Sequence, residues 1–140
     1  MGYIIDYYEE INQAKFLLLD YLIREEVYKE LGEPILHKSE NRYLFLQPNT
    51  RMNLTTSSLG FICFSLKNGI ATLKYAYIFK QYRGKGLFSS LHSLFEKKCH
   101  QMQVIKIKVV SSNMALPIYI HYGYKVTKEY KICTHLYKNL

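Results

Sequence analysis

The sequence turns from strand to helix within Tyr77–Leu91, which reads YIFKQYRGKGLFSSL. An apolar run typical of a strand enters this stretch, Gly84 and Gly86 form a loop, and a helical pattern leaves it. Such a loop directs backbone N–H groups and a helix N-terminus toward one point, where a phosphate or pyrophosphate binds. The stretch therefore predicts a protein that holds a nucleotide-like anion.

The rest of the chain places alternating strands and helices around this loop. Asn68-Gly69 between two apolar runs is a strong hairpin signal. In chain order we expect strands over 1–8, 42–47, 59–66, 70–79, 104–110, 124–130 and 132–137, and helices over 9–31, 86–101 and 112–122, the last capped by Ser112 or Asn113. The order predicts an α/β fold with a mixed sheet and a right-handed crossover through the helix that follows the loop.

Composition limits the class of protein. The chain has 140 residues, of which 49% are hydrophobic, and this predicts a single domain over 1–140 with a real core. Its formal net charge of +8 favours anionic ligands. Cys63, Cys99 and Cys133 form no Cys-x-x-Cys pair, so we expect reduced thiols in a cytoplasmic protein and no metal site. The longest apolar run, 16–23, contains Asp20 and is too short to cross a membrane.

Two familiar phosphate-binding motifs do not fit the loop. A Walker A loop needs Gly-Lys followed by Ser or Thr, whereas Gly84-Lys85 is followed by Gly86. A dinucleotide fingerprint needs a third glycine, and Ser89 stands at that position. The loop therefore belongs to a different kind of phosphate site.

The loop resembles the acetyl-coenzyme A (acetyl-CoA) loop of GCN5-related N-acetyltransferases, the GNAT family, written Arg/Gln-x-x-Gly-x-Gly/Ala. One register runs from Gln81 to Gly86 and satisfies the pattern literally. The other runs from Arg83 to Phe88 and matches the order tyrosine, arginine, glycine, variable residue, glycine that is common in the family. In the second register Phe88 replaces a small residue.

A second block downstream resembles the same family. Many members show Asn, then Ala three residues later, Tyr four residues after that, and Gly with an aromatic after four more. The chain keeps this spacing in Ala115, Tyr119, Gly123 and Tyr124, with Ser112 at the Asn position and Asn113 one residue late. Together the two blocks cover 70–130.

The resemblance implies a GNAT-like acyl-CoA N-acyltransferase fold, an α+β mixed sheet whose central strands 70–79 and 104–110 splay apart. It implies transfer of an acetyl group from acetyl-CoA, the co-substrate, to a primary amine by direct attack in a ternary complex. Tyr119 would protonate the leaving thiolate, and an amide near Ile78 would stabilise the oxyanion. The implied cofactor-binding residues are Tyr77, Ile78 and Phe79 for the pantetheine arm, Arg83, Gly84, Lys85, Gly86, Leu87, Phe88 and Ser89 for the pyrophosphate, and Ser112 and Asn113 at the second block.

The general base is not identified, because strand 70–79 contains no Asp or Glu, which relatives often keep there. The remaining candidates are Tyr75, Tyr77, His92, His121 and Glu40, with His92 expected on the surface of its helix and His121 at a polar position beside the last helix.

Two other functions stay open. Basic residues that interleave with aromatics, such as Arg42 with Tyr43 and Lys74 with Tyr75, could form a nucleic-acid-binding module, although no recognised motif accompanies them. The second is a CoA-binding protein of the same fold without catalysis. The acceptor amine cannot be read from the sequence, and the chain is expected to be a monomer or a homodimer that does not bind a membrane.

Overall fold

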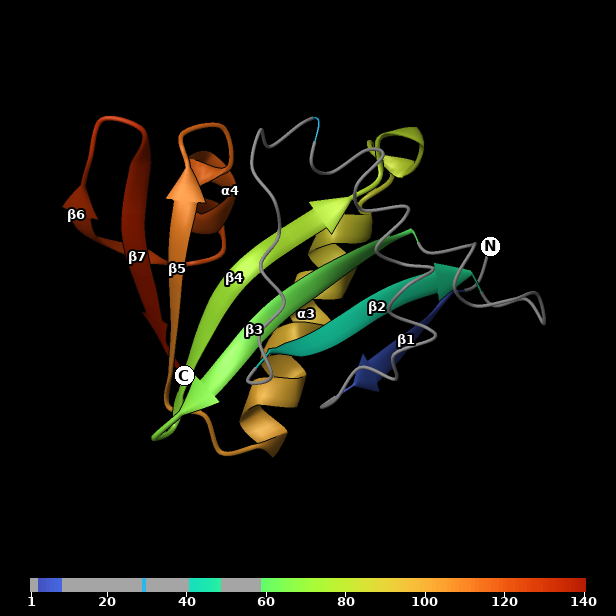
Figure 1. Cartoon of the computed structure of the whole chain (residues 1–140), viewed down its shortest axis with the longest axis horizontal. Coiled ribbons are helices and arrows are strands. Elements are labelled where there is room, and N and C mark those ends of the chain that lie inside the picture. The colour runs from blue at the N-terminus through green and yellow to red at the C-terminus, as the bar shows by residue number, and fades with distance from the viewer. Residues whose placement is uncertain (1–2, 9–28, 30–40, 49–58) are drawn as a thin grey trace.

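One mixed sheet of seven strands organises the computed structural model, which describes residues 3–8, 29, 41–48 and 59–140. The strand order is β1-β2-β3-β4-β5-β7-β6 (Figure 1). β4 and β5 pair in parallel, and the other neighbours pair antiparallel. The strands are β1 (Tyr3–Tyr8), β2 (Arg42–Pro48), β3 (Gly60–Lys67), β4 (Ile70–Ile78), β5 (Lys106–Ser112), β6 (Lys125–Glu129) and β7 (Cys133–Asn139), and the helices are the 3-10 turn η2 (Lys80–Tyr82), α3 (Leu87–Gln101) and α4 (Leu116–His121).

The predicted elements are confirmed wherever the structure describes them. Asn68 and Gly69 have φ values of 52° and 76°, as the two-residue hairpin turn between β3 and β4 requires. β5 begins and ends two residues later than predicted, and α4 begins only at Leu116. The predicted helix 9–31 lies outside the described residues apart from Lys29, so it stays a prediction.

The centre of the sheet opens between β4 and β5. The two strands pair only from Ile70 with Lys106 to Leu73 with Val109, although both continue further. On the β3 side the register shifts at the same level, which leaves Lys74 as a β-bulge. Because a bulge bends and twists its strand, β4 diverges from β5 toward their carboxyl ends (Figure 1). The predicted splay of the central strands is therefore confirmed.

The bulge also changes which β4 side chains face each side of the sheet. Before it, Ala71 and Leu73 pack in the core beneath α3, and after it Ile78 does. The intervening Tyr77 packs on the opposite face in a buried aromatic cluster. That cluster consists of Tyr43, Phe45, Phe61, Cys63, Tyr77 and Phe79. Both faces of β4 are thus packed at its carboxyl end, and the open edge of β4 is left for the site.

α3 supplies most of the core on its side of the sheet. Leu91, Phe95 and Cys99 lie one or two turns apart on its buried face, and the Phe95 ring meets the Phe64 ring edge-on at a centroid distance of 5.0 Å. Burial raises the pKa of the Cys99 thiol to about 12, so this thiol stays protonated and unreactive. No described helix is long and apolar enough to cross a membrane.

Candidate active site

A cleft opens where β4 and β5 diverge, and its cavity volume is about 490 Å³. Tyr77 and Ile78 line it from the end of β4, and Ser112 and Tyr119 line the other side. From the glycine loop and the start of α3 it is lined by Arg83, Gly84, Gly86, Leu87, Phe88 and Ser89. The structure therefore brings ten of the predicted site residues to one cleft, while Lys85, Asn113 and Phe79 are not among the residues that line it.

The glycine loop ends in an uncapped helix N-terminus. Gly84 and Gly86 have φ values of 79° and 73°, and a Cβ at either would meet nothing within 4 Å. Glycine is needed here for the left-handed backbone rather than for space. Gly86 is the N-cap of α3, without a side-chain cap and without an acidic residue in the first turn. The first amides of α3 thus lack helical acceptors, and the positive end of the helix dipole favours an anion there.

Arg83 fastens the loop to the end of β4. Its Nε donates to the Ile78 carbonyl oxygen at 2.8 Å, and its guanidinium carbon lies 5.0 Å from the centroid of the Tyr77 ring. These contacts hold the Arg83 side chain along β4, and they therefore fix the position of the glycine loop. Lys85, in contrast, is exposed and projects outside the cleft lining.

The free edge of β4 is defined by the hydrogen bond of Phe79. Its N–H donates to the Leu59 carbonyl at 3.0 Å, on the β3 side of the strand. Successive residues of a strand present their backbone groups to opposite edges, so Ile78 and Ala76 present theirs to the gap. Phe79 was expected in the cleft but does not line it, because its amide bonds to Leu59 and its ring packs in the aromatic cluster. Ala76, which the sequence reasoning missed, takes a place on this edge and lines the cleft.

Tyr119 presents a buried phenol to the cleft. The side chain is 4% exposed, and no described residue forms a hydrogen bond with its hydroxyl. Burial raises the pKa of Tyr119 above its usual value, so the group is a neutral proton donor. A buried hydroxyl without a partner among the described residues is unusual, and here it borders the cavity that a ligand would fill.

Phe88 connects the loop side of the cleft to the tyrosine side. Its ring stacks on the rings of Tyr122 and His92, each at a centroid distance of 6.1 Å, and meets Tyr119 edge-on at 6.3 Å. The large side chain is therefore directed toward α4 and away from the glycines. Phe88 stands where the family has a small residue, but its ring does not cover the backbone of the glycine loop.

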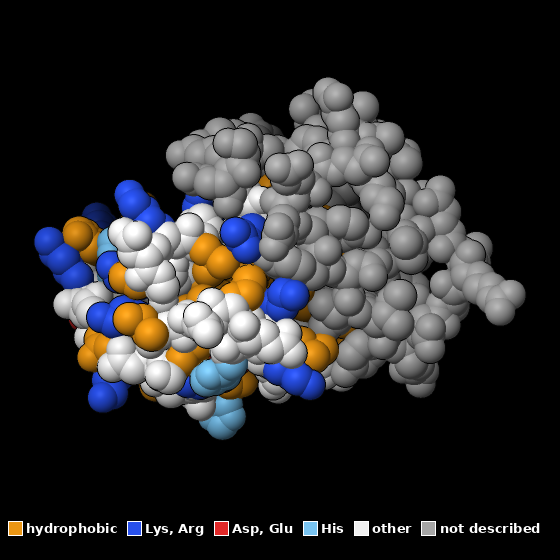
Figure 2. Space-filling view, turned by 90° about the horizontal axis from the view of Figure 1, so that it is seen from below, with side chains coloured by type: hydrophobic (Ala, Val, Ile, Leu, Met, Phe, Trp, Pro, Cys, Tyr) orange, Lys and Arg blue, Asp and Glu red, His pale blue; other side chains and the backbone are white. Residues whose placement is uncertain are grey.

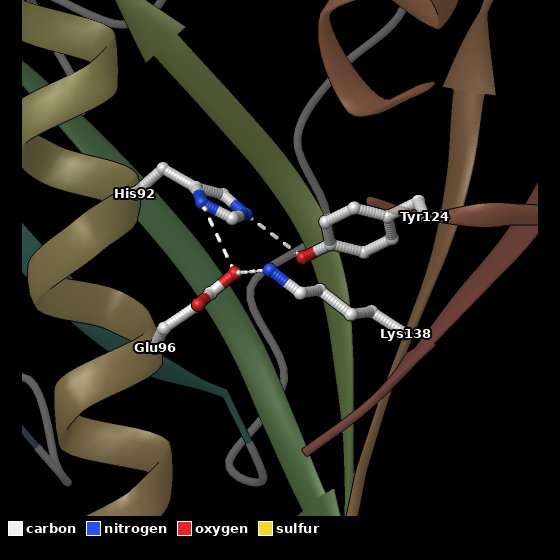
Figure 3. A network of polar contacts seen from close by, with 4 residues as sticks. All are labelled: His92, Glu96, Tyr124 and Lys138. Atoms are coloured by element: carbon white, nitrogen blue, oxygen red, sulfur yellow. Dashed lines mark hydrogen bonds and ion pairs between the residues drawn. The ribbon is translucent and has the colours of Figure 1, made fainter. Parts of the chain in front are cut away.

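His92 lies behind Phe88 in a partly buried polar network with Tyr124, Glu96 and Lys138 (Figure 3). It is 3% exposed, so the expectation of a surface residue was wrong. Its Nε2 lies 2.8 Å from the Tyr124 hydroxyl, and its Nδ1 lies 3.6 Å from Glu96 Oε1, to which Lys138 Nζ donates at 2.6 Å. The carboxylate favours a proton on Nδ1, so the Tyr124 hydroxyl donates to Nε2. The spacing Phe88, His92, Phe95, Cys99 is a helical stripe that could have revealed the burial.

Burial lowers the pKa of His92 to about 4, with Lys138 lowering it further and Glu96 opposing the shift. The imidazole is therefore neutral at physiological pH. It does not line the cleft, and its Nε2 is occupied by Tyr124. His92 thus serves to hold Tyr124 and to pack against Tyr122, whose ring centroid lies 4.6 Å away.

The other sequence candidates for a base are spread across the molecule. His121 is exposed and does not line the cleft, while Tyr75 packs against the aromatic cluster on the opposite face. Glu40 lies outside the described residues. Among the candidates that the structure describes, Tyr77 alone lines the cleft.

At the second block the structure separates Ser112 from Asn113. Ser112 Oγ accepts a hydrogen bond from the Ala115 amide at 3.3 Å and lines the cleft. Asn113 Nδ2 donates to the Lys131 carbonyl at 3.2 Å. The N-cap of α4 is Ala115, so Ser112 orders the turn before the helix and neither predicted residue caps it.

A fold with splayed central strands, a glycine loop and a helix N-terminus at their carboxyl ends defines a class of acyl-CoA-binding proteins. A family model described as the acetyltransferase (GNAT) domain matches residues 11–135 of this sequence. The chain therefore belongs to the GNAT acetyltransferase family. A search of curated proteins finds no match.

Solved structures support the fold. A candidate N-acetyltransferase from Lactobacillus plantarum is 16% identical with a TM-score of 0.82, over 100% of this chain and 99% of that chain. The PaiA N-acetyltransferase from Thermoplasma acidophilum, solved in complex with coenzyme A, is 14% identical with a TM-score of 0.74, over 100% of both chains. Tetrahymena GCN5 is 13% identical with a TM-score of 0.75, over 99% of this chain and 96% of that chain. At these identities the likeness concerns the fold alone.

Proposed function

We propose that this chain transfers an acetyl group from acetyl-CoA to a primary amine, as a single catalytic domain over 1–140. The observation that carries the proposal is the cleft between β4 and β5, which has an uncapped helix N-terminus at one side and a buried phenol at the other. The first suits a pyrophosphate and the second suits a leaving thiolate.

The backbone of this cleft offers hydrogen-bond partners to two parts of acetyl-CoA. The pyrophosphate would accept hydrogen bonds from the amides of the glycine loop and of the first turn of α3. The pantetheine arm would pair with the free edge of β4 at Ala76, in the manner of an added strand, which leaves the Ile78 N–H for the thioester carbonyl. This arm would occupy the gap that β5 leaves when its pairing ends at Val109.

The reaction needs few side chains. The amine nitrogen attacks the thioester carbonyl carbon, and the Ile78 N–H, which faces the gap, stabilises the oxyanion. The carbon–sulfur bond then breaks, and the sulfur takes a proton from the Tyr119 hydroxyl. The amine loses its own proton to water, which afterwards restores the phenol.

The described residues that line the cleft include no Asp, Glu or His, so they provide no strong base. The amine therefore arrives neutral, having lost its ammonium proton in solution. We expect kcat/KM to rise with pH until the pKa of the acceptor is passed.

The test is a calorimetric titration of acetyl-CoA into wild type, Gly86→Glu and Gly86→Asn. A carboxylate beside the pyrophosphate site should weaken binding at least about 100-fold through like-charge repulsion and desolvation. Asn tolerates the left-handed backbone and adds no charge, so it should keep affinity within about tenfold. Wild type that binds no acetyl-CoA would overturn the proposal and favour the basic nucleic-acid module. Binding without turnover of any amine would favour the CoA-binding protein without catalysis.

A further inference from the structure

A second hollow lies on the sheet face opposite α3, and its cavity volume is about 390 Å³. Along β5, Ile107 and Val109 are buried toward the core under α3, so Lys106, Lys108 and Val110 project from the other face. On β7, next to β5, the same alternation brings His135 and Tyr137 to this face. The hollow, called the β5–β7 groove from here on, is lined by Lys106, Lys108, Val110, Thr127, His135 and Tyr137 together with Thr72 and two core side chains.

The groove carries cations and hydroxyls, and the described residues that line it include no carboxylate. From residue 59 to the C-terminus the only acidic residues are Glu96 and Glu129. Glu96 is engaged by Lys138 beside α3. Glu129 lies directly across from the buried Thr134 on β7. Cross-strand partners share one face of the sheet, so Glu129 lies on the α3 side and not on the groove side with His135. Lys and Arg side chains likewise dominate the charge of the described residues on the face shown in Figure 2.

The groove leads directly to the cleft. Val110 lines the groove and Ser112 lines the cleft, on the same face of β5 and roughly 7 Å apart along the strand. β4 and β5 cease to pair at Val109, so the sheet opens beside Val110. A molecule in the groove can therefore present one end to the gap from the side opposite α3.

We propose that the β5–β7 groove holds the acceptor and that the acceptor is an amine that carries a carboxylate or phosphate group. This inference rests on the acetyltransferase function proposed above. The anion lies near Val110, beside its cross-strand partner His135, where the flexible Lys108 side chain, His135 and the Tyr137 hydroxyl supply donors and Lys106 adds positive charge further along β5. The amine points toward Ser112 and the thioester. A polyamine acceptor is disfavoured, because it would bring like charges together at the same lysines.

The first test compares kcat/KM for matched acceptors in the release of CoA. Ethanolamine, O-phosphoethanolamine and β-alanine differ in a neutral, phosphate or carboxylate end, and cadaverine supplies a cationic one. Wild type should prefer an anionic acceptor, and the Lys106→Gln/Lys108→Gln variant should lose roughly tenfold or more for anionic acceptors only. The control Lys97→Gln removes one lysine charge from an exposed position on α3 and should leave all four values unchanged. Equal use of ethanolamine or cadaverine by wild type would overturn the inference.

A second test needs no turnover. Isotope-labelled protein saturated with CoA is titrated with O-phosphoethanolamine, β-alanine or ethanolamine, and backbone amide shifts are followed by NMR. The anionic amines should shift the amides of Lys108, Val110 and His135, and the double variant should lose these shifts. Absence of groove shifts in wild type overturns the inference even if acetyl-CoA binds normally. Failure of acetyl-CoA to bind, measured by calorimetry, would instead contradict the proposed function.

Discussion

The two sides of the cleft are built in opposite ways. The loop side, around Gly84 and Gly86, is exposed and offers backbone amides that have no acceptor within α3. The tyrosine side, backed by His92 and Tyr124, is buried and closed by side chains that bond or stack on one another. The loop side can therefore change its ligand affinity with little effect on the fold, whereas the tyrosine side contributes mainly to stability and to the position of one phenol.

The largest effect is expected from His92→Ala on the tyrosine side. The change leaves a cavity among the rings and a buried Tyr124 hydroxyl without its acceptor, so the free energy of unfolding should fall by about 3 kcal/mol. Urea denaturation measures it, with Ser93→Ala on the exposed side of α3 as a control expected to stay within about 0.5 kcal/mol. A loss as small as that of the control would mean that the buried network does not stabilise the tyrosine side.

Acid should act through the same residue. Folded protein keeps His92 neutral down to about pH 4, whereas the unfolded chain protonates it near pH 6.5. Between these values the unfolded state binds the extra proton, so stability rises with pH, and the contribution is complete above pH 6.5 and lost toward pH 4. The whole span corresponds to about 3 kcal/mol.

Denaturation of wild type and of His92→Gln at pH 7 and pH 5 isolates this contribution, because Gln does not titrate. Glu96, Tyr124 and Lys138 surround the site in both proteins. Wild type should lose more stability than the variant on acidification. The same loss in both would contradict the assignment of a neutral buried histidine.

Tyr119→Phe should separate chemistry from stability. Loss of the proton donor should lower kcat by about 100-fold or more. The hydroxyl has no described partner, so its removal should leave the free energy of unfolding unchanged or raise it by up to about 1 kcal/mol. Tyr124→Phe is the matched control, because it breaks the bond to His92 and should lose about 1 kcal/mol of stability with kcat nearly intact. If Tyr119→Phe keeps full kcat, the leaving thiolate needs no phenol.

The smallest effect is expected on the loop side. Gly84→Ala places a Cβ in open space but in a left-handed conformation, so it should cost about 1 kcal/mol of stability, and Gly84→Asn should cost less. Thermal and urea denaturation compare the two. A loss several times larger would show that the loop is packed as tightly as the tyrosine side.

The two sides of the cleft also differ in how far the sequence predicts them. Gly84, Gly86 and the helix that follows predict an anion site made of backbone amides, because positive φ and a helix start depend on local residues. The spacing of Tyr119 and Gly123 pointed to the opposite side. His92 was misplaced, because whether a polar residue on a helical stripe is buried depends on what packs over it. Ala76 was missed, because the edge that each β4 residue presents depends on its pairing with β3.

The order of strands and helices, the hairpin turn and the glycine loop follow from the amino-acid sequence, because turns, caps and hydrophobic periods are local properties. Tertiary packing decided that pairing of β4 with β5 stops at Leu73 and Val109, and that a neutral histidine supports the tyrosine side. It also decided that Lys106 and Lys108 line one groove with His135. These features join residues far apart in the chain, and register and burial, rather than local preference, place them together.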